Sequence, residues 1–217
     1  MVRWCLQSAV LLSIGAVMAL AGMVQGGEPI KLPPPQTEGG MPLMAALKAR
    51  ASSRSFSNKP LPLQVLSNLL WAACGINRPE SGKRTAPTAM NMQEIDVYVA
   101  LADGLYLYNH KDHALELVLK EDLRAATGRQ SFVAEAPVNL IFVADRAKMG
   151  RASEEMKDFY SATDTGFISQ NVYLFCASEG LATVVRNMVD KPALAEKMGL
   201  RQDQRVVMAQ SVGYPKE

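Results

Sequence analysis

One apolar stretch decides the fold of this chain: Phe167-Ile168-Ser169-Gln170-Asn171-Val172-Tyr173-Leu174-Phe175-Cys176-Ala177. It forms the second half of a long helix predicted over residues 154–177, which Gly180 is expected to end. Apolar residues occupy nearly every side of this stretch, so we expect the helix to be central in the domain or to lie in a subunit interface. Gln170 and Asn171 are the exceptions, and there they need backbone, subunit or ligand partners.

Helices and strands are mixed around this stretch rather than strictly alternating. Two shorter helices are predicted before it: one begins at Pro42, and the other ends at Gly75, a residue that can take positive φ. The predicted strands are 95–101, 105–108, 115–119, 138–143, 181–186 and 205–212, and short helices are expected near 121–126 and 193–198. No GxGxxG follows a strand, which argues against a doubly wound dinucleotide fold. The expected fold class is α+β, with a mostly antiparallel sheet packed on the central buried helix.

The N-terminus has the layout of a secretory signal peptide. Arg3 is followed by an apolar run over residues 9–21, which ends in the small-x-small site Ala19-Leu20-Ala21. We expect a signal peptide over residues 1–26, cleaved near 21–26, and therefore a periplasmic or secreted bacterial protein. The run is short for a stable membrane span, so an uncleaved anchor is the weaker alternative. Residues 27–41 are rich in glycine and proline and predict an extended, largely unpacked tether before one domain over residues 42–217.

Composition and residue types argue against several functions. A net charge of +2 with 20% charged residues gives no electrostatic case for nucleic-acid binding. His110 and His113 are expected in a solvated turn rather than a metal site, and neither stands beside a candidate nucleophile. No paired carboxylates stand out, so hydrolytic chemistry has no support. Cys74 and Cys176 lie in apolar helical contexts and are expected to be buried thiols, although one disulfide between them stays open in an oxidising compartment.

Two polar segments stand out as places for ligand recognition. The loop over residues 75–93 is rich in hydroxyl and amide side chains and is broken by Pro79 and Pro87, so it is either a polar surface loop or a ligand-facing one. Arg50 and Arg54 are four residues apart with hydroxyls between them, a combination that can grip a phosphate. A solvated pair at a helix end is the alternative for these arginines.

Four motifs occur in order along residues 43–215. The first, Arg50-Ala51-Ser52-Ser53-Arg54-Ser55-Phe56, resembles the Arg-Arg-Ser-x-Arg-x-Phe motif of the nitroreductase superfamily of FMN flavoproteins, with Ala51 in place of the second arginine. Thr85-Ala86-Pro87-Thr88-Ala89-Met90-Asn91-Met92-Gln93 is similar to its Ala-Pro-Ser-x-x-Asn-x-Gln loop, with Thr88 in place of serine. Gly166, Gln170-Asn171 and the turn 177–181 resemble its buried dimer helix and the Gly-Leu turn that follows. Residues 104–108 with 113–115 resemble its SagB-type dehydrogenase branch.

The resemblance implies a dimeric nitroreductase-like fold with one FMN in each of two interface clefts. The segment 50–54 would hold the phosphate and ribityl chain, with Lys216 as the candidate from the tail. The loop 87–93 would line the isoalloxazine, and the turn 179–180 would approach flavin N5 through its backbone. No catalytic side chain and no metal ligand is assigned, because the flavin carries the electron transfer. The implied FMN contacts are Arg50, Ser52, Arg54, Pro87, Thr88, Asn91, Gln93, Glu179, Gly180 and Lys216.

The same resemblance implies an FMN-dependent oxidoreductase. A donor, NADH or NADPH by analogy, would pass electrons through flavin N5 to an electron-poor acceptor such as a nitroaromatic or a quinone. SagB-type relatives that oxidise peptide azolines use a Lys-Tyr pair that is not located in this chain, which counts against that reaction. An exported protein meets little NAD(P)H, so two alternatives stay open: a periplasmic electron-relay protein with an unknown redox partner, and a non-catalytic binding protein of the same fold.

Overall fold

The computed structural model describes residues 27–216. The predicted signal peptide, residues 1–26, lies outside the described residues and stays a prediction. Within the part of the chain that is described, no helix has the length and apolar character needed to cross a membrane. The helices and strands in chain order are β1 (Ile30–Lys31), α1 (Leu43–Ala49), α2 (Leu63–Cys74), β2 (Ile76–Arg78), β3 (Lys83–Arg84), β4 (Ile95–Leu101), β5 (Gly104–Asn109), β6 (Ala114–Leu119), α3 (Phe132–Glu135), β7 (Val138–Asp145), α4 (Glu154–Glu179), β8 (Ala182–Arg186), α5 (Lys191–Lys197) and β9 (Gln204–Gly213).

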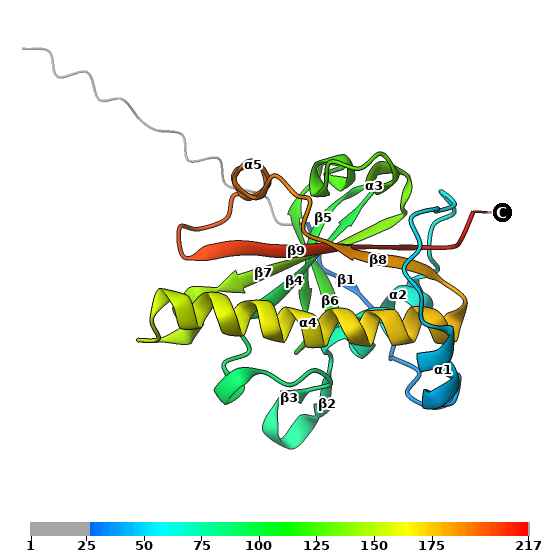
Figure 1. Ribbon diagram of the computed structural model, residues 1–217, viewed down its shortest axis with the longest axis horizontal. Coiled ribbons are helices and arrows are strands. Elements are labelled where there is room, and N and C mark those ends of the chain that lie inside the picture. Colours follow the sequence, from blue (N-terminus) through cyan, green and yellow to red (C-terminus); the bar gives the residue numbers. More distant parts are fainter. Residues whose placement is uncertain (1–26, 217) are drawn as a thin grey trace, which may run out of the picture.

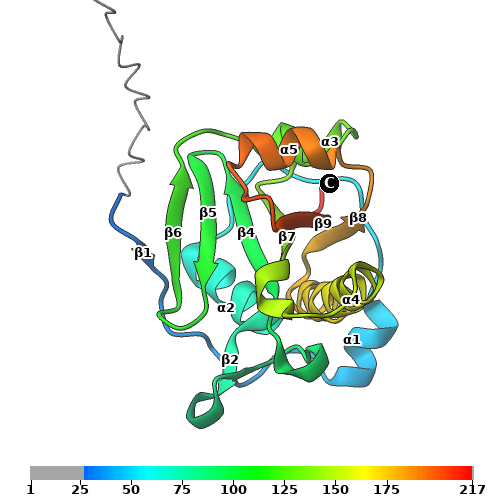
Figure 2. The ribbon, with the colours of Figure 1, turned by 90° about the vertical axis from the view of Figure 1, so that its left-hand side faces the viewer.

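A seven-stranded sheet forms the centre of the domain (Figure 1, Figure 2), with strand order β1-β6-β5-β4-β7-β9-β8. Every neighbouring pair of strands in it is antiparallel, and β2 and β3 form a separate antiparallel hairpin. β7 lies between β4 and β9 and is buried along its whole length. The predicted α+β fold with a mostly antiparallel sheet is therefore confirmed.

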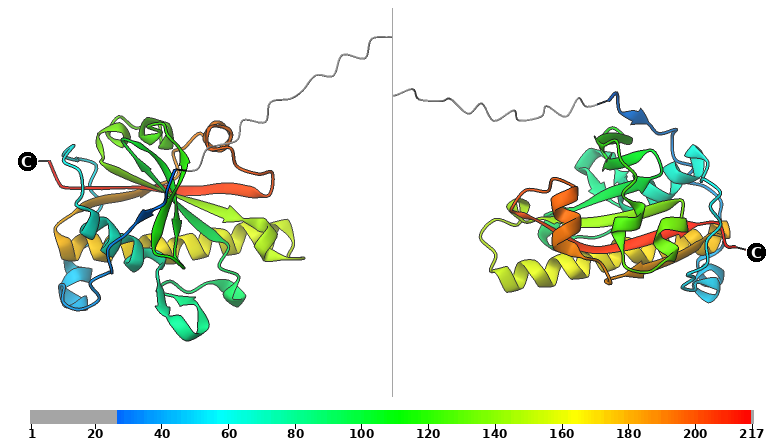
Figure 3. Two further views of the ribbon diagram at one scale, coloured as in Figure 1. Left: turned by 180° about the vertical axis from the view of Figure 1, so that it is seen from behind. Right: turned by 90° about the horizontal axis from the view of Figure 1, so that it is seen from above.

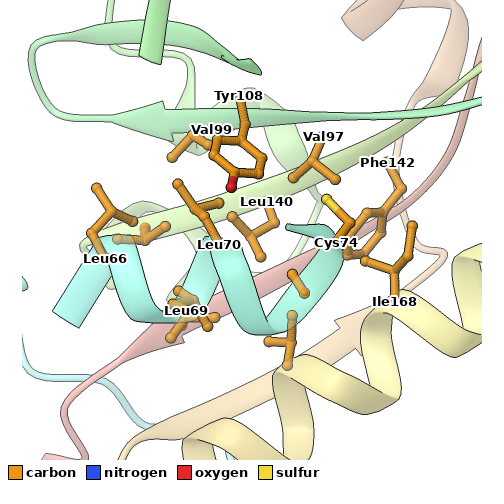
Figure 4. Packing of buried hydrophobic residues seen from close by; sticks show 14 of the residues in the cluster. Leu66, Leu69, Leu70, Cys74, Val97, Val99, Tyr108, Leu140, Phe142 and Ile168 are labelled. Atoms are coloured by element: carbon orange, nitrogen blue, oxygen red, sulfur yellow. The ribbon is translucent and has the colours of Figure 1, made fainter. Parts of the chain in front are cut away.

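The sheet has two apolar faces, because successive side chains of a strand alternate between them. Val97, Val99, Leu140 and Phe142 pack against α2 and α4 (Figure 4). Their neighbour Ile141 belongs to the second cluster, which contains α5. α4 and α5 therefore lie on opposite faces of the sheet, as Figure 1 also shows.

α4 is the long helix that the apolar stretch predicts. Ile168 and Cys176 are buried against the core, so the helix is central to the packing of the domain. Its other side is open to solvent in the single chain: Phe159 is 66% exposed and Phe167 is 43% exposed. The polar exception Asn171 donates to Ala73 O at 3.4 Å, which gives it the backbone partner that burial requires.

Residues 27–41, here called the strap, pack on the domain and are not the loose tether that the sequence predicts. β1 pairs with β6 through Ile30 opposite Leu115, and Leu32 is only 4% exposed. Ser67 Oγ of α2 donates to Pro33 O at 2.6 Å. Figure 3 shows the strap running from β1 at the edge of the sheet to α1. The strap is extended, as expected, but it is part of the folded unit.

Two local features differ from the prediction: the conformation of Gly75 at the end of α2 and the short helix near 121–126. Gly75 ends α2 with a φ of −69°, so the glycine is not there to take positive φ. A Cβ at this position would come within 2.5 Å of the Trp71 side chain, so close packing is what requires glycine. The short helix expected near 121–126 is instead a 3-10 helix over Arg124–Thr127.

Candidate functional site

The segment after α1 is fixed against α4 and β8. The Ser52 Oγ lies 2.8 Å from the hydroxyl of Tyr173, and that hydroxyl accepts from the N–H of Val185 at 3.0 Å. The Arg50 guanidinium lies over the Tyr173 ring, 5.4 Å from its centroid, which is a cation–π contact. Arg50 and Arg54 are both exposed, so their charges are available to a ligand. Tyr173, which the sequence analysis did not assign, is the anchor of this segment.

A recess near the C-terminus gathers more positive charge. It has a volume of about 760 Å³, and Lys59, Gly180 and Lys216 are among the residues that line it. The N–H of Lys216 donates to Ser55 O at 3.4 Å, which places the tail against the arginine segment. The Lys216 ammonium lies 4.0 Å from the Glu135 carboxylate. The recess adjoins the segment 50–56 through Phe56 and the turn after α4 through Gly180. The recess and this segment together are here called the basic region.

The loop before β4 has an unusual backbone. Met90, Asn91 and Gln93 take φ values of 50°, 56° and 50°, in the left-handed region that disfavours residues with a Cβ. The Gln93 side chain donates to Gly82 O at 3.0 Å, and its backbone N–H donates to Thr88 Oγ1 at 3.1 Å. The loop is therefore held in a definite shape, while the Asn91 side chain remains exposed.

The two predicted sets of flavin contacts lie at different places along α4. The loop 87–93 is tied to the helix at Asp164, because the N–H of Ala89 donates to Asp164 Oδ2 at 3.0 Å. The basic region surrounds Gly180, just past the other end of the helix. Gly180 is 16 positions after Asp164, which corresponds to about 24 Å along the helix at a rise of 1.5 Å per residue. A single chain therefore does not bring the predicted ring contacts and phosphate contacts together.

Glu179 and Gly180 face different spaces. Glu179 lines a second cavity, of about 550 Å³, whose walls come from α2, α4 and the strap. Trp71 also lines it, and the strap is fixed there because the N–H of Met41 donates to Ser178 Oγ at 2.8 Å. The charged residues that line this cavity are all acidic, whereas two lysines and one acidic residue, Glu135, line the recess beside Gly180.

A buried pair of carboxyl groups lies beneath the loop, which corrects the expectation that no paired carboxylates stand out. Glu94 precedes β4 and is 0% exposed, and Asp164 on α4 is 3% exposed. Burial is the largest cause that raises the pKa of the Glu94 carboxyl, and the neighbouring Asp164 charge raises it further. The two acids are far apart in the sequence, so no local motif could have revealed the pair.

The two histidines lie in the expected turn, residues 110–113, but they are half-buried and hydrogen-bonded rather than solvated. His113 Nε2 lies 2.7 Å from Ser67 Oγ, and its Nδ1 lies 2.9 Å from the Tyr108 hydroxyl. The ring of His110 contacts the guanidinium of Arg84, 2.9 Å from Nε2. Burial lowers the pKa of both histidines, that of His110 to about 4. Among the described residues no cluster of side chains suited to a metal ion occurs.

The two cysteines of the described chain are separate. Cys74 and Cys176 are free and buried. Burial raises the pKa of the Cys74 thiol to about 11 and also raises the pKa of Cys176. The expectation of buried thiols is confirmed, and the disulfide alternative is not realised in this structure.

The chain is similar in sequence to known proteins. The family model described as "Nitroreductase family" matches residues 47–214. A candidate nitroreductase from Methanocaldococcus jannaschii is 34% identical over 145 residues, which cover 62% of this chain and 73% of that protein.

Solved structures show the same fold. The crystal structure of a candidate nitroreductase from Ralstonia eutropha has a TM-score of 0.85 and 44% sequence identity, covering 88% of this chain and 91% of that one. The NADPH:FMN oxidoreductase from Vibrio harveyi, solved in complex with NAD⁺, has a TM-score of 0.61 and 18% identity over 81% of this chain and 69% of that one. The second likeness supports the fold alone, whereas the family match covers most of the sequence. This chain belongs to the nitroreductase family.

Proposed function

We propose that the protein is an FMN-dependent oxidoreductase. The observation that carries the proposal is the basic region around Arg50, Gly180 and Lys216, found in a chain of the nitroreductase family. In this function NADH or NADPH is the electron donor. An electron-poor molecule such as a nitroaromatic or a quinone is the acceptor.

The residues present fit the chemical groups of FMN. Arg50, Lys59 and Lys216 supply the positive charge that a phosphate monoester requires. Gly180 takes a φ of 67°, and a Cβ added there would meet no atom within 4 Å. The backbone at this turn is therefore open to a planar ligand. The exposed amide of Asn91 is suited to the hydrogen-bonding edge of the ring.

The protein's own part in the reaction is to bind and orient. Bound FMN would supply the electron transfer, which asks for no acid or base from the chain. Arg50 and Lys216 would hold the phosphate. Tyr173 would fix the direction of Arg50 and Ser52, because it contacts both of them.

The proposed assembly is a homodimer that meets on the outer face of α4. Phe159 and Phe167 are exposed there, and Met44 of the adjacent α1 is 76% exposed. Apolar surface of this kind is typical of a subunit interface. Two copies of α4 packed antiparallel would set the loop 87–93 of one chain against the basic region of the other. That arrangement would join the two contact sets that a single chain keeps about 24 Å apart.

The proposed location is the periplasm or the exterior of a bacterial cell. The apolar run at residues 9–21 motivates this proposal. N-terminal sequencing of the purified protein tests it, and a start between residues 22 and 27 is expected from the cleavage near 21–26. Protein that stays cytosolic and keeps Met1 would contradict it.

An absorbance spectrum with a flavin stoichiometry tests the function. One FMN per chain is expected in the purified protein, bleached by NADH or NADPH without oxygen and restored by a nitroaromatic or a quinone. Bound flavin that stays oxidised with both nucleotides would refute the reductase and leave the electron-relay alternative. Protein that binds no flavin, even after incubation with excess FMN, would leave only a non-catalytic binding role.

A further inference from the structure

The loop 87–93 needs support, because its backbone is strained. Three of its residues, Met90, Asn91 and Gln93, hold left-handed φ values that residues with a Cβ rarely adopt. Strain of this kind persists only where surrounding contacts over-determine the conformation. The shape of the loop must therefore be fixed by groups outside these three positions.

Two of the groups that fix the loop are the buried acids Glu94 and Asp164. Thr88 Oγ1 donates to Glu94 Oε2 at 3.1 Å and accepts from the N–H of Gln93 at 3.1 Å. The N–H of Ala89 donates to Asp164 Oδ2 at 3.0 Å. Glu94 thus holds the two ends of the loop through one hydroxyl, and Asp164 holds its middle to α4.

The hydrogen bonds of Glu94 indicate which acid carries a proton. Its second oxygen, Oε1, is buried and accepts no hydrogen bond. A bare carboxylate oxygen in that position is costly, whereas a protonated carboxyl can donate to a neighbouring carboxylate. Asp164 is the neighbouring acid. Burial raises the pKa of Glu94, which agrees with this assignment.

Two further groups face Asp164 across a small cavity between α2, β3 and α4. Cys74 and Arg84 line it together with Asp164. The thiol of Cys74 is neutral, because burial raises its pKa to about 11. Arg84 donates to Ile95 O at 3.4 Å and contacts His110, and its buried Nε has no partner. Arg84 is therefore the cation among the residues that line this cavity with Asp164.

The remaining charged neighbour of Glu94 does not alter this balance. The N–H of Asp145 donates to Glu94 O at 2.8 Å, so β7 meets Glu94 through the backbone. The Asp145 carboxylate is engaged elsewhere, 3.0 Å from Arg201 and 4.0 Å from Lys148.

We propose that Glu94 and Asp164 are positioning residues that share one proton and thereby hold the loop 87–93 in its ligand-binding shape. Loss of that proton to solvent leaves two adjacent buried negative charges, which repel each other and release the loop. The order of the loop, and with it the affinity for flavin, then depends on pH. The statement about flavin rests on the proposed function, whereas the support of the loop needs no ligand.

Hydrogen exchange of the Ala89 and Gln93 amides, corrected for the intrinsic rate, tests the proposal on flavin-free protein. Both amides donate into the acid-pair network. Their protection should fall at least tenfold as pH rises from about 6 to about 9, as the raised pKa of a buried carboxyl requires. In a parallel titration the dissociation constant of FMN should rise over the same range.

Two variants and one control sharpen this test. The side-chain amide introduced by Glu94→Gln cannot ionise but can still donate to Asp164. The protection of the Ala89 and Gln93 amides in this variant should therefore not change with pH. Asp164→Asn can donate to an ionised Glu94 and still accept from Ala89, so it should also flatten the profile and serves if the first variant does not fold. Glu121→Gln, at an exposed carboxylate in the turn after β6, should behave as wild type.

The outcomes separate this proposal from the function. The proposal of a shared proton is wrong if the protection of the Ala89 and Gln93 amides in the wild type does not change with pH. It is also wrong if both variants fold and their protection falls with pH as it does in the wild type. A loop that loosens with pH in a protein that never binds FMN keeps this inference and removes the proposed function. A protein that binds FMN but whose amide protection does not change with pH supports the proposed function and contradicts this inference.

Discussion

At the scale of single residues, Arg50 offers an exposed guanidinium whose direction is set by the Tyr173 ring. Arg50→Ala removes a charge-assisted contact to the phosphate, worth about 1.5–3 kcal/mol. The affinity for FMN should therefore fall about tenfold or more. Titration of the flavin-free protein with FMN, followed by flavin fluorescence, measures this change.

The matched control for that variant is Arg129→Ala. Arg129 is also exposed, but it pairs with Asp190 at 3.2 Å, and neither residue lines the recess beside Gly180. Its removal should leave the FMN affinity within about twofold, since exposed ion pairs contribute little. Equal affinities in wild type and Arg50→Ala would show that the phosphate assignment is wrong.

Glu94 makes folding stability depend on pH, in a direction fixed by its raised pKa. Between the usual pKa of glutamate and the raised one, the folded state holds a proton that the unfolded chain has lost. This stabilisation is complete below the usual pKa and is lost as pH rises through the raised one, by up to about 1.4 kcal/mol per pH unit. Urea unfolding across this range should show the decline, and Glu94→Gln should reduce it. A wild type whose stability rises with pH here would contradict the assignment.

At the scale of elements, the sequence predicts what local pattern encodes. The meander β4–β6 and the helix α4 follow from periodicity and long apolar runs, and the structure contains them nearly at the predicted bounds. The sequence does not reveal the packing of the strap, because its glycines and prolines indicate only an extended chain. Its pairing of Ile30 with Leu115 joins residues far apart in the sequence, which no local pattern reveals.

The same limit applies to the candidate site. Arg50 and Ser52 stand in a recognisable motif, so the sequence could assign them a role. Tyr173 was visible only as part of an apolar helix, and its contact with both residues depends on how α4 packs. Glu94 and Asp164 meet only through tertiary structure, so their pairing was invisible until the fold was known.

The strap should contribute to stability as a packed element. Leu32 is buried in the main core and belongs to the strap. Leu32→Ala should lower the free energy of unfolding by about 2–5 kcal/mol, as other large-to-small changes in cores do. Denaturant unfolding measures it, with Lys31→Ala as the control because that neighbouring side chain is exposed. Equal free energies of unfolding for Leu32→Ala and Lys31→Ala would show that the strap does not contribute to stability as a packed element.

At the scale of the whole molecule, the two predicted sets of flavin contacts lie at different places along α4, so the proposed flavin site would be incomplete in one chain. The loop 87–93 meets the helix at Asp164, and the basic region lies past its C-terminal end. The outer face of α4 exposes Phe167 between them and Phe159 just before Asp164. The apolar face and the separated contact sets therefore point to the same proposed arrangement, two chains with antiparallel α4 helices.

A charge placed on this face tests the arrangement as a whole. Phe159→Asp should weaken dimerisation by at least about tenfold, because a buried unpaired carboxylate opposes association. Flavin content should fall with it, since each site would lose the loop of the partner chain. Met188→Asp is the control: Met188 is 57% exposed but follows β8, away from α4, so both dimer and flavin should persist. Sedimentation velocity and flavin absorbance measure the two quantities on the same sample. A wild type that is monomeric yet holds one FMN per chain would show that the loop and the basic region do not need a second chain to meet.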